Sequence, residues 1–266
     1  SRGLGDVYKR QLYTYDKLHG MIDYAKFLGS PVTPWMLPFL LCSASRFLPI
    51  MLLFLLLISE SPFRTRQQSF VILRTGKRIW IKGQLLYLLI ISICFTALVW
   101  VLSWIWYLPE LTWSTAWGDS LLTASQGLDP SFFGVYLNLG YRVIKNAEPI
   151  LVTLWCAAVM VLVCYMLGVI MTVCNLYLKK GLGAIITSIL VGISLIPEYF
   201  TIDPGVIKMT IWISPVSWMD RMLMGNNNQN LPSYAFGVLA PALLGSILSM
   251  FLILVIGKRD VETDKE

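Results

Sequence analysis

Five long apolar stretches constrain the fold of this chain more than any other feature. They cover residues 38–59, 84–107, 150–178, 183–200 and 235–257. A helix rises about 1.5 Å per residue, so about 20 apolar residues cross the hydrocarbon core of a bilayer. A soluble domain could not bury this surface, because 56% of the 266 residues are hydrophobic and only 14% are charged. The pattern predicts an all-α, polytopic membrane helical bundle with five spans.

Individual residues support these spans. Arg46 lies inside the first stretch, so we expect it close to an interface, where its guanidinium group can reach water. The second stretch ends in Trp and Tyr residues, which collect at membrane–water interfaces. The five cysteines lie in or beside the apolar stretches and lack disulfide or zinc-ligand spacing. We therefore interpret them as small membrane hydrophobes and predict no metal site.

The distribution of Lys and Arg predicts the orientation of the spans. The segment 60–83 carries six basic residues and one acid, and the turn at 179–180 is Lys-Lys. Lys258 and Arg259 follow the last span, where the tail at 259–266 begins. The intervening segments 109–149 and 199–234 contain a larger share of acids. The positive-inside rule therefore places the loop 60–83 and the C-terminus in the cytoplasm.

The N-terminal region fits this topology less simply. Residues 1–11, SRGLGDVYKRQ, resemble the in-frame translation of a sequencing adapter, and we treat them as a non-native scar. Residues 12–37 are then expected outside the cell, which leaves an odd number of spans. We expect a first span upstream of Leu12, which would bring the number of spans to six. Residues 38–258 are then the part of the transmembrane domain that is present. A native N-terminus outside the cell is the alternative.

Two outer segments contain apolar pieces that are too short to cross a membrane. In the second of them, pieces at 206–213 and 218–223 are separated by Pro215. In the first, residues 120–146 could form an interfacial helix. Apolar segments of this length are typical of re-entrant or interfacial helices. An ordinary loop on the lipid headgroups is the alternative for both.

One loop element resembles a known family. ISESPF (58–63) leads to RTGKRIWIKGQLLY (74–87), which enters a span directly. The element is similar to the R-T-G/S-K/R-x-x-W-x-x-G-Q element of ABC-2-type transporter permease subunits from Firmicutes-like bacterial exporters. A weaker resemblance extends through WGDSLLTASQG (117–127) and ISPVSWMDR (213–221) over most of residues 12–258.

The resemblance implies a role for the basic loop. In that family the loop after the second span is a coupling segment that docks on a separate ATP-hydrolysing subunit. Basic residues with apolar anchors are a common composition of interface hot spots. We also expect Gly76 to divide the loop helix in two, and the alternative is that the cations only fix topology and touch lipid headgroups. The predicted ATPase-coupling residues are Phe70, Arg74, Thr75, Gly76, Lys77, Arg78, Trp80, Lys82, Gly83 and Gln84, with Ile79 as a further possible anchor.

The resemblance also implies cofactors, partners and location. The chain has no GxxxxGK[ST] phosphate loop, so ATP and Mg are expected in a partner ABC ATPase subunit and no cofactor in this chain. It is therefore expected to be a permease without enzymatic activity. We expect a homo- or heterodimer with a second permease in the bacterial plasma membrane, and no nucleic-acid partner. The apolar, aromatic spans favour an amphipathic or hydrophobic cargo, such as a peptide, a drug or a lipid-like molecule.

Two other classes of membrane protein remain as alternatives. An ion-coupled secondary transporter or channel predicts buried acids and inverted repeats with broken helices. An intramembrane enzyme needs His, Asp or Glu clusters at membrane depth. Only Arg46 and Glu198 approach such a position in the sequence, and each can reach an interface. The single histidine, His19, precedes the spans and is not expected to be catalytic.

Overall fold

The computed structural model shows an all-α chain. It describes residues 23–63, 68–105, 107–108, 111–125, 144–145, 147–178, 181–199, 203–225 and 231–256. These residues form two compact units, which are described separately below. Unit 1 combines Ser1–Ser43 with Leu98–Ala157, and unit 2 combines Ala44–Ala97 with Ala158–Glu266.

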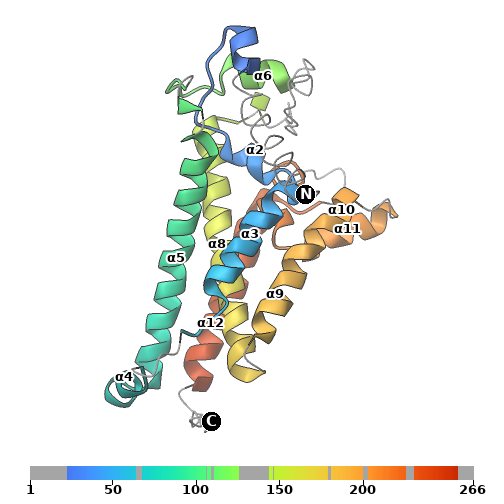
Figure 1. Cartoon of the computed structure of the whole chain (residues 1–266). Helices are drawn as coiled ribbons and strands as arrows, with labels where there is room; N and C mark the ends of the chain where they lie inside the picture. Colours follow the sequence, from blue (N-terminus) through green and yellow to red (C-terminus); the bar gives the residue numbers. More distant parts are fainter. Residues whose placement is uncertain are drawn as a thin grey trace, which may run out of the picture. The chain divides into compact units, whose positions relative to one another are not determined.

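Among the described residues, four helical runs are long and apolar enough to cross a membrane (Figure 1). They are α5 (Lys77–Ile105), α8 (Pro149–Tyr177), a run from Leu182 to Tyr199, and α12 (Tyr234–Ile256). The third run consists of α9 (Leu182–Gly192), the 3-10 turn η3 (Ile193–Leu195) and α10 (Ile196–Tyr199). Four of the five predicted spans therefore coincide with helices that are long and apolar enough to cross a membrane, and the multi-pass, all-α character is confirmed for the described residues.

The predicted span at 38–59 is not a single helix. The structure divides it into α2 (Leu37–Leu41) and α3 (Ala44–Ile58), separated at Cys42 and Ser43. A helix of 15 residues is about 22 Å long, which is less than the hydrocarbon core of about 30 Å. The Cys42 thiol donates a hydrogen bond of 3.0 Å to the Pro38 carbonyl in the last turn of α2. Serine favours helix ends over helix interiors, which is consistent with a break at Ser43.

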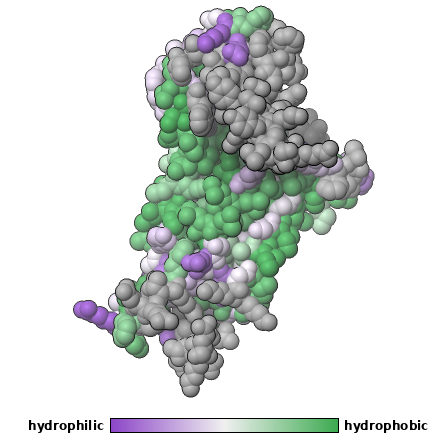
Figure 2. All heavy atoms as spheres, viewed as in Figure 1, coloured by the Kyte–Doolittle hydropathy of each residue, from purple (hydrophilic) through white to green (hydrophobic). Residues whose placement is uncertain are grey.

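In unit 2 the spans pack through periodic buried faces. On α5 the buried side chains Ile81, Leu85 and Leu88 recur at helical spacing, whereas Leu86 and Ile90 are exposed. Figure 2 shows that hydrophobic residues cover most of the visible face of the long helices. In a bilayer such exposed apolar faces contact lipid, so they need no protein partner.

Small residues let α8 approach its neighbours in unit 2. A Cβ at Gly168 would lie 3.2 Å from Cδ2 of Leu88 and 3.5 Å from Cδ1 of Ile58. The Tyr165 hydroxyl also lies 2.8 Å from Oγ of Ser249 on α12. Close backbone approach with interhelical polar contacts is typical of membrane helix packing. The small residues Gly168 and Ser249 therefore serve helix packing.

The segment after α10 forms a short helix in unit 2. The helix α11 (Pro204–Ile213) has 10 residues, and η4 (Ser217–Met219) is a single 3-10 turn. Phe236 of α12 packs against Trp212 and Trp218, with ring centroids 4.8 and 5.5 Å away. The predicted apolar piece at 206–213 is thus a helix too short to span. Both the re-entrant and the interfacial interpretation of this segment remain compatible with it.

In unit 1, hydrogen bonds join chain segments that are far apart in the sequence. Thr33 donates a hydrogen bond of 2.8 Å from its hydroxyl to the carbonyl of Trp117, whose indole donates one of 2.8 Å to the Ala147 carbonyl. Trp35 donates a third, of 2.7 Å, to the Ser114 carbonyl. The helix α6 covers Asp119–Ser125, the start of the predicted interfacial helix at 120–146.

Several sequence-based predictions lie outside the described residues. They concern the scar at 1–11, His19, most of the interfacial helix at 120–146, the Lys-Lys turn at 179–180 and the tail at 259–266. These stay predictions.

Candidate coupling loop

The basic loop consists of a short helix followed directly by a long one. The helix α4 covers Gln68–Thr75, and α5 begins at Lys77. Gly76 separates them with φ of +83°, a left-handed conformation that glycine adopts without the strain of a Cβ atom. The predicted helix break at Gly76 is therefore found. Figure 1 shows α4 running across the end of α5.

The loop is shorter than the sequence suggests. Its boundary was expected at Gly83, but the structure continues α5 back to Lys77, so residues 77–83 are helical. Lys77, Arg78 and Lys82 consequently lie on the first two turns of a spanning helix. Lys, Arg, Ile and Trp are compatible with a helix, and the single Gly83 costs only about 1 kcal/mol relative to alanine.

The tip of the loop presents apolar and basic side chains together. Phe70 is 75% exposed, Leu73 is 83% exposed, and Arg74 is exposed beside them. Positions 70, 73 and 74 share one face of α4 because they are three and four residues apart. We call Phe70, Leu73 and Arg74 the docking face. Leu73 was missed in the sequence, although its spacing of three from Phe70 was available as a signal.

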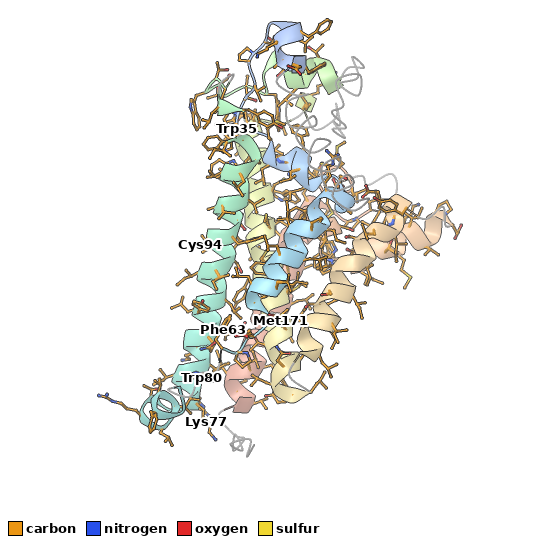
Figure 3. All side chains as sticks on the ribbon, in the orientation of Figure 1. Trp35, Phe63, Lys77, Trp80, Cys94 and Met171 are labelled. Carbon is orange, nitrogen blue, oxygen red and sulfur yellow. The ribbon has the colours of Figure 1, made fainter. Side chains whose placement is uncertain are left out.

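The other predicted loop residues divide by burial. Trp80 is 7% exposed and faces the interior of the unit, so it does not project with the tip residues (Figure 3). Ile79 is 62% exposed, and Lys77 is half-buried. Residues 68–84 contain four cations and no acid, which makes this segment basic. The remaining exposed members of the predicted set are Thr75, Gly76, Arg78, Lys82 and Gly83.

The segment before α4 is fastened to α5. We call residues 59–63, which directly follow α3, the loop base. Its peptide bond between Ser61 and Pro62 is cis. The Gln84 side-chain carbonyl accepts a hydrogen bond of 3.2 Å from the Phe63 amide, and the Phe63 ring packs edge-on against Tyr87 at 5.0 Å. The predicted coupling residue Gln84 thus holds the base of the loop rather than its tip.

The loop base is also fastened to α8. The Ser61 hydroxyl lies 2.6 Å from the Thr172 hydroxyl. The Asn175 amide donates hydrogen bonds to the carbonyls of Ser59 and Ser61, at 3.2 and 2.7 Å. Its oxygen accepts from the amides at the start of α9. We call this set the Asn175 junction, and it comprises Ser59, Ser61, Thr172, Asn175, Gly181 and Gly183.

The junction could not be identified from the sequence, because Ser61 lies more than 100 residues from Thr172 and Asn175 along the chain. The available signal was a carboxamide near the end of a 29-residue apolar helix, an environment in which a polar group requires partners.

The docking face, the loop base and the Asn175 junction are the features of the described residues that bear on function. Within the described ranges, no three His, Cys, Asp or Glu side chains are placed to hold a metal ion. Comparisons of the chain with protein-family models, with curated proteins and with solved structures found no match.

Proposed function

We propose that this chain is the permease subunit of an ATP-driven ABC exporter and that the docking face on α4 binds its ATPase subunit. The observation that supports this most is the pairing of Phe70 and Leu73 with Arg74 on one exposed helix face. Large apolar side chains beside an arginine are typical of the residues that dominate binding energy at protein interfaces. The loop resemblance noted above points to the same partner.

The connections of the loop suit a coupling role. The helix α4 is joined to the spanning helix α5 through Gly76, and the loop base preceding it is fastened to α5 and α8. A displacement of α4 by a partner would therefore act on helices that cross the bilayer. ATP can shift the permease between states only if the ATPase binds those states with different affinity. If the ATPase docks on α4 and α4 occupies a different position in each state, the affinity of the ATPase differs between the states.

The other parts of the proposal follow from the assignment of the chain as the permease subunit of an ABC exporter. Two permease chains, identical or different, line the pathway in the bacterial plasma membrane, with α4 and the C-terminus in the cytoplasm. ATP and Mg bind the partner subunits, and this chain hydrolyses nothing. The cargo is amphipathic or hydrophobic, in keeping with spans that are almost free of charge. An ion-coupled carrier or channel is the alternative function, and it requires no ATPase partner.

Affinity purification tests the proposal. The tagged chain is extracted in mild detergent from membranes of a host that carries the cognate genes, and bound proteins are identified by mass spectrometry. The wild type is expected to recover a nucleotide-binding subunit, and the triple variant Arg74→Glu, Lys77→Glu, Arg78→Glu to lose it. The matched control is Lys145→Glu, an exposed cation in unit 1.

The outcomes separate the alternatives. Recovery by wild type and control but not by the triple variant supports both the transporter class and the docking site. Equal recovery by all three keeps the class and moves the docking site elsewhere. If a well-folded wild type recovers no ATPase, the exporter assignment fails, and a carrier or channel becomes the better explanation.

A further inference from the structure

Asn175 uses its whole hydrogen-bonding capacity in the junction. A carboxamide has two N–H donors and an oxygen with two lone pairs. The Asn175 amide nitrogen donates to the Ser59 and Ser61 carbonyls, while its oxygen accepts from the amides of Gly181 at 3.2 Å and Gly183 at 3.0 Å. The partners are carbonyls on one side and N–H groups on the other, so they fix which way the amide points.

The partners of Asn175 belong to two different helix ends. Ser59 and Ser61 follow α3, and Gly181 and Gly183 lie at the start of α9. Helix ends leave backbone groups without intrahelical partners, and satisfying them stabilises the ends where they lie. One side chain on α8 therefore holds the end of α3 and the start of α9 at the same point.

The start of α9 also packs directly on the backbone of α8. A Cβ at Gly183 would lie 2.5 Å from the Met171 carbonyl oxygen and 2.6 Å from the Asn175 side-chain oxygen. Both distances are shorter than any normal van der Waals contact, so only glycine fits there. This close approach brings the Gly183 amide within reach of Asn175.

A second contact reinforces the hold on the loop base. Thr172, three residues before Asn175 and on the same face of α8, contacts the Ser61 hydroxyl at 2.6 Å. Thr172 is 0% exposed and Ser61 is 1% exposed, so water does not compete for this bond. The loop base is thus held to α8 at two successive points, and to α5 through Gln84.

We infer that Asn175 is a positioning residue that fastens the base of the coupling loop to α8 and α9, so that the loop base and these helices move as one body. The inference extends the proposed function, because it identifies the helices to which a force on α4 is delivered. The joint itself can be tested without any partner protein.

The test uses the full chain in detergent or nanodiscs, with its five cysteines replaced by alanine or serine. Spin labels are placed at Glu60→Cys on the loop base and at Ile185→Cys on α9, two exposed positions. Pulsed electron resonance measures the distance distribution between the labels, and hydrogen exchange measures protection of the Gly181 and Gly183 amides. The parent chain is expected to show one narrow distribution and protected amides.

Two substitutions at Asn175 separate the two sides of the junction. In Asn175→Asp the acceptor oxygens remain but the N–H donors are lost, so Asn175 no longer holds the loop base, which keeps only its contacts to Thr172 and Gln84, while the amides of α9 keep a partner. We expect a broadened label distribution with retained protection of Gly181 and Gly183. In Asn175→Leu both sides fail, and that protection is lost as well. The control is Thr187→Val, because the buried Thr187 hydroxyl bonds only within α9, to the Gly183 and Ala184 carbonyls.

A cross-link provides a rescue. In the Asn175→Asp chain, Ser61→Cys and Thr172→Cys replace two hydroxyls that lie 2.6 Å apart, and oxidation should join them. The disulfide is expected to restore the narrow distribution, and a reductant to abolish it again. A general loss of folding would not be reversed in this way, so the rescue distinguishes positioning from stability alone.

The results that overturn the inference are equally definite. The inference is contradicted if the distance distribution between the labels is unchanged in both Asn175 variants. It is also contradicted if Asn175→Asp already loses the protection of the Gly181 and Gly183 amides, because the two sides of the Asn175 junction would then not be separable. A cross-link that forms but leaves the distribution broad also contradicts it. Failure to recover an ATPase with the wild-type chain would contradict the proposed function but would not affect these measurements. Failure of the proposed function and failure of the inference about Asn175 are therefore distinguishable.

Discussion

The docking face and the Asn175 junction belong to the same loop but are built in opposite ways. The docking face consists of side chains exposed by three quarters or more at Phe70 and Leu73, on a helix joined to α5 through one glycine. Apart from the exposed Gly181, the junction consists of buried or half-buried residues, and Asn175 makes all four of its hydrogen bonds within it. The comparison shows that the loop is exposed at its tip and hydrogen-bonded to α5 and α8 at its base.

The largest effect on stability is expected from Gly183→Ala, at the junction. The new Cβ would meet the Met171 carbonyl oxygen, a backbone atom that cannot rotate away. Overpacking of this kind costs about 1–3 kcal/mol, so the midpoint of thermal unfolding in detergent should fall clearly. Gly192→Ala is the control, since a Cβ there meets nothing within 4 Å. Equal midpoints for the two variants would show that α9 is not pressed against α8.

A smaller loss is expected from Ser61→Ala. The change removes the buried bond to Thr172, and a typical hydrogen bond contributes about 1 kcal/mol. Thr172 also donates to the Gly168 carbonyl at 2.8 Å, which limits the penalty for its hydroxyl. Ser246→Ala, an exposed position with only an intrahelical bond, should be close to neutral. A penalty at Ser246 as large as that at Ser61 would argue against a special role for the junction.

At the break between α4 and α5, Gly76→Ala is expected to cost about 1–2 kcal/mol from left-handed strain alone, because a Cβ would meet no neighbour. Gly83→Ala meets no neighbour either but lies inside α5, where alanine is favoured by about 1 kcal/mol. The two substitutions should therefore shift the unfolding midpoint in opposite directions. Shifts of the same sign would contradict the helix break at Gly76.

At the tip, Phe70→Ala with Leu73→Ala should leave stability within about 0.5 kcal/mol, because exposed side chains contribute little to folding. The same double variant should lose recovery of the ATPase subunit. Phe27→Ala, in unit 1 and 67% exposed, is the matched control and should retain it. A destabilised double variant would mean that the docking face is packed within the protein instead.

The spans could be predicted from the sequence because hydropathy is a local property. α5, α8 and α12 each need only a continuous apolar run, and their ends agree with the prediction within a few residues except at Lys77. The break at Cys42 and Ser43 could not be predicted from the same property, since both residues are compatible with an apolar stretch. The early start of α5 was missed because basic residues indicate the end of a span but not the end of its helix.

In the candidate site, too, features that depend on local sequence could be predicted, and features that depend on distant segments could not. Composition and spacing indicated Phe70, Arg74 and Gly76, which act through local helix geometry. Asn175 escaped notice because its role depends on backbone groups of α3 and α9 that meet it only in the folded chain. The inward placement of Trp80 was missed for a related reason. Which face of α5 is buried depends on the neighbouring helices, and the residues around Trp80 are apolar on both sides.

The most direct test of the central claim is a photo-cross-link from the docking face in native membranes. A photoreactive phenylalanine analogue replaces Leu73, and a second chain carries it at Phe27 as the control. After irradiation, the account predicts an adduct between position 73 and a nucleotide-binding subunit, identified by mass spectrometry, and no such adduct from position 27. Adducts from position 73 with lipids alone would contradict the account and show that α4 lies on the headgroups.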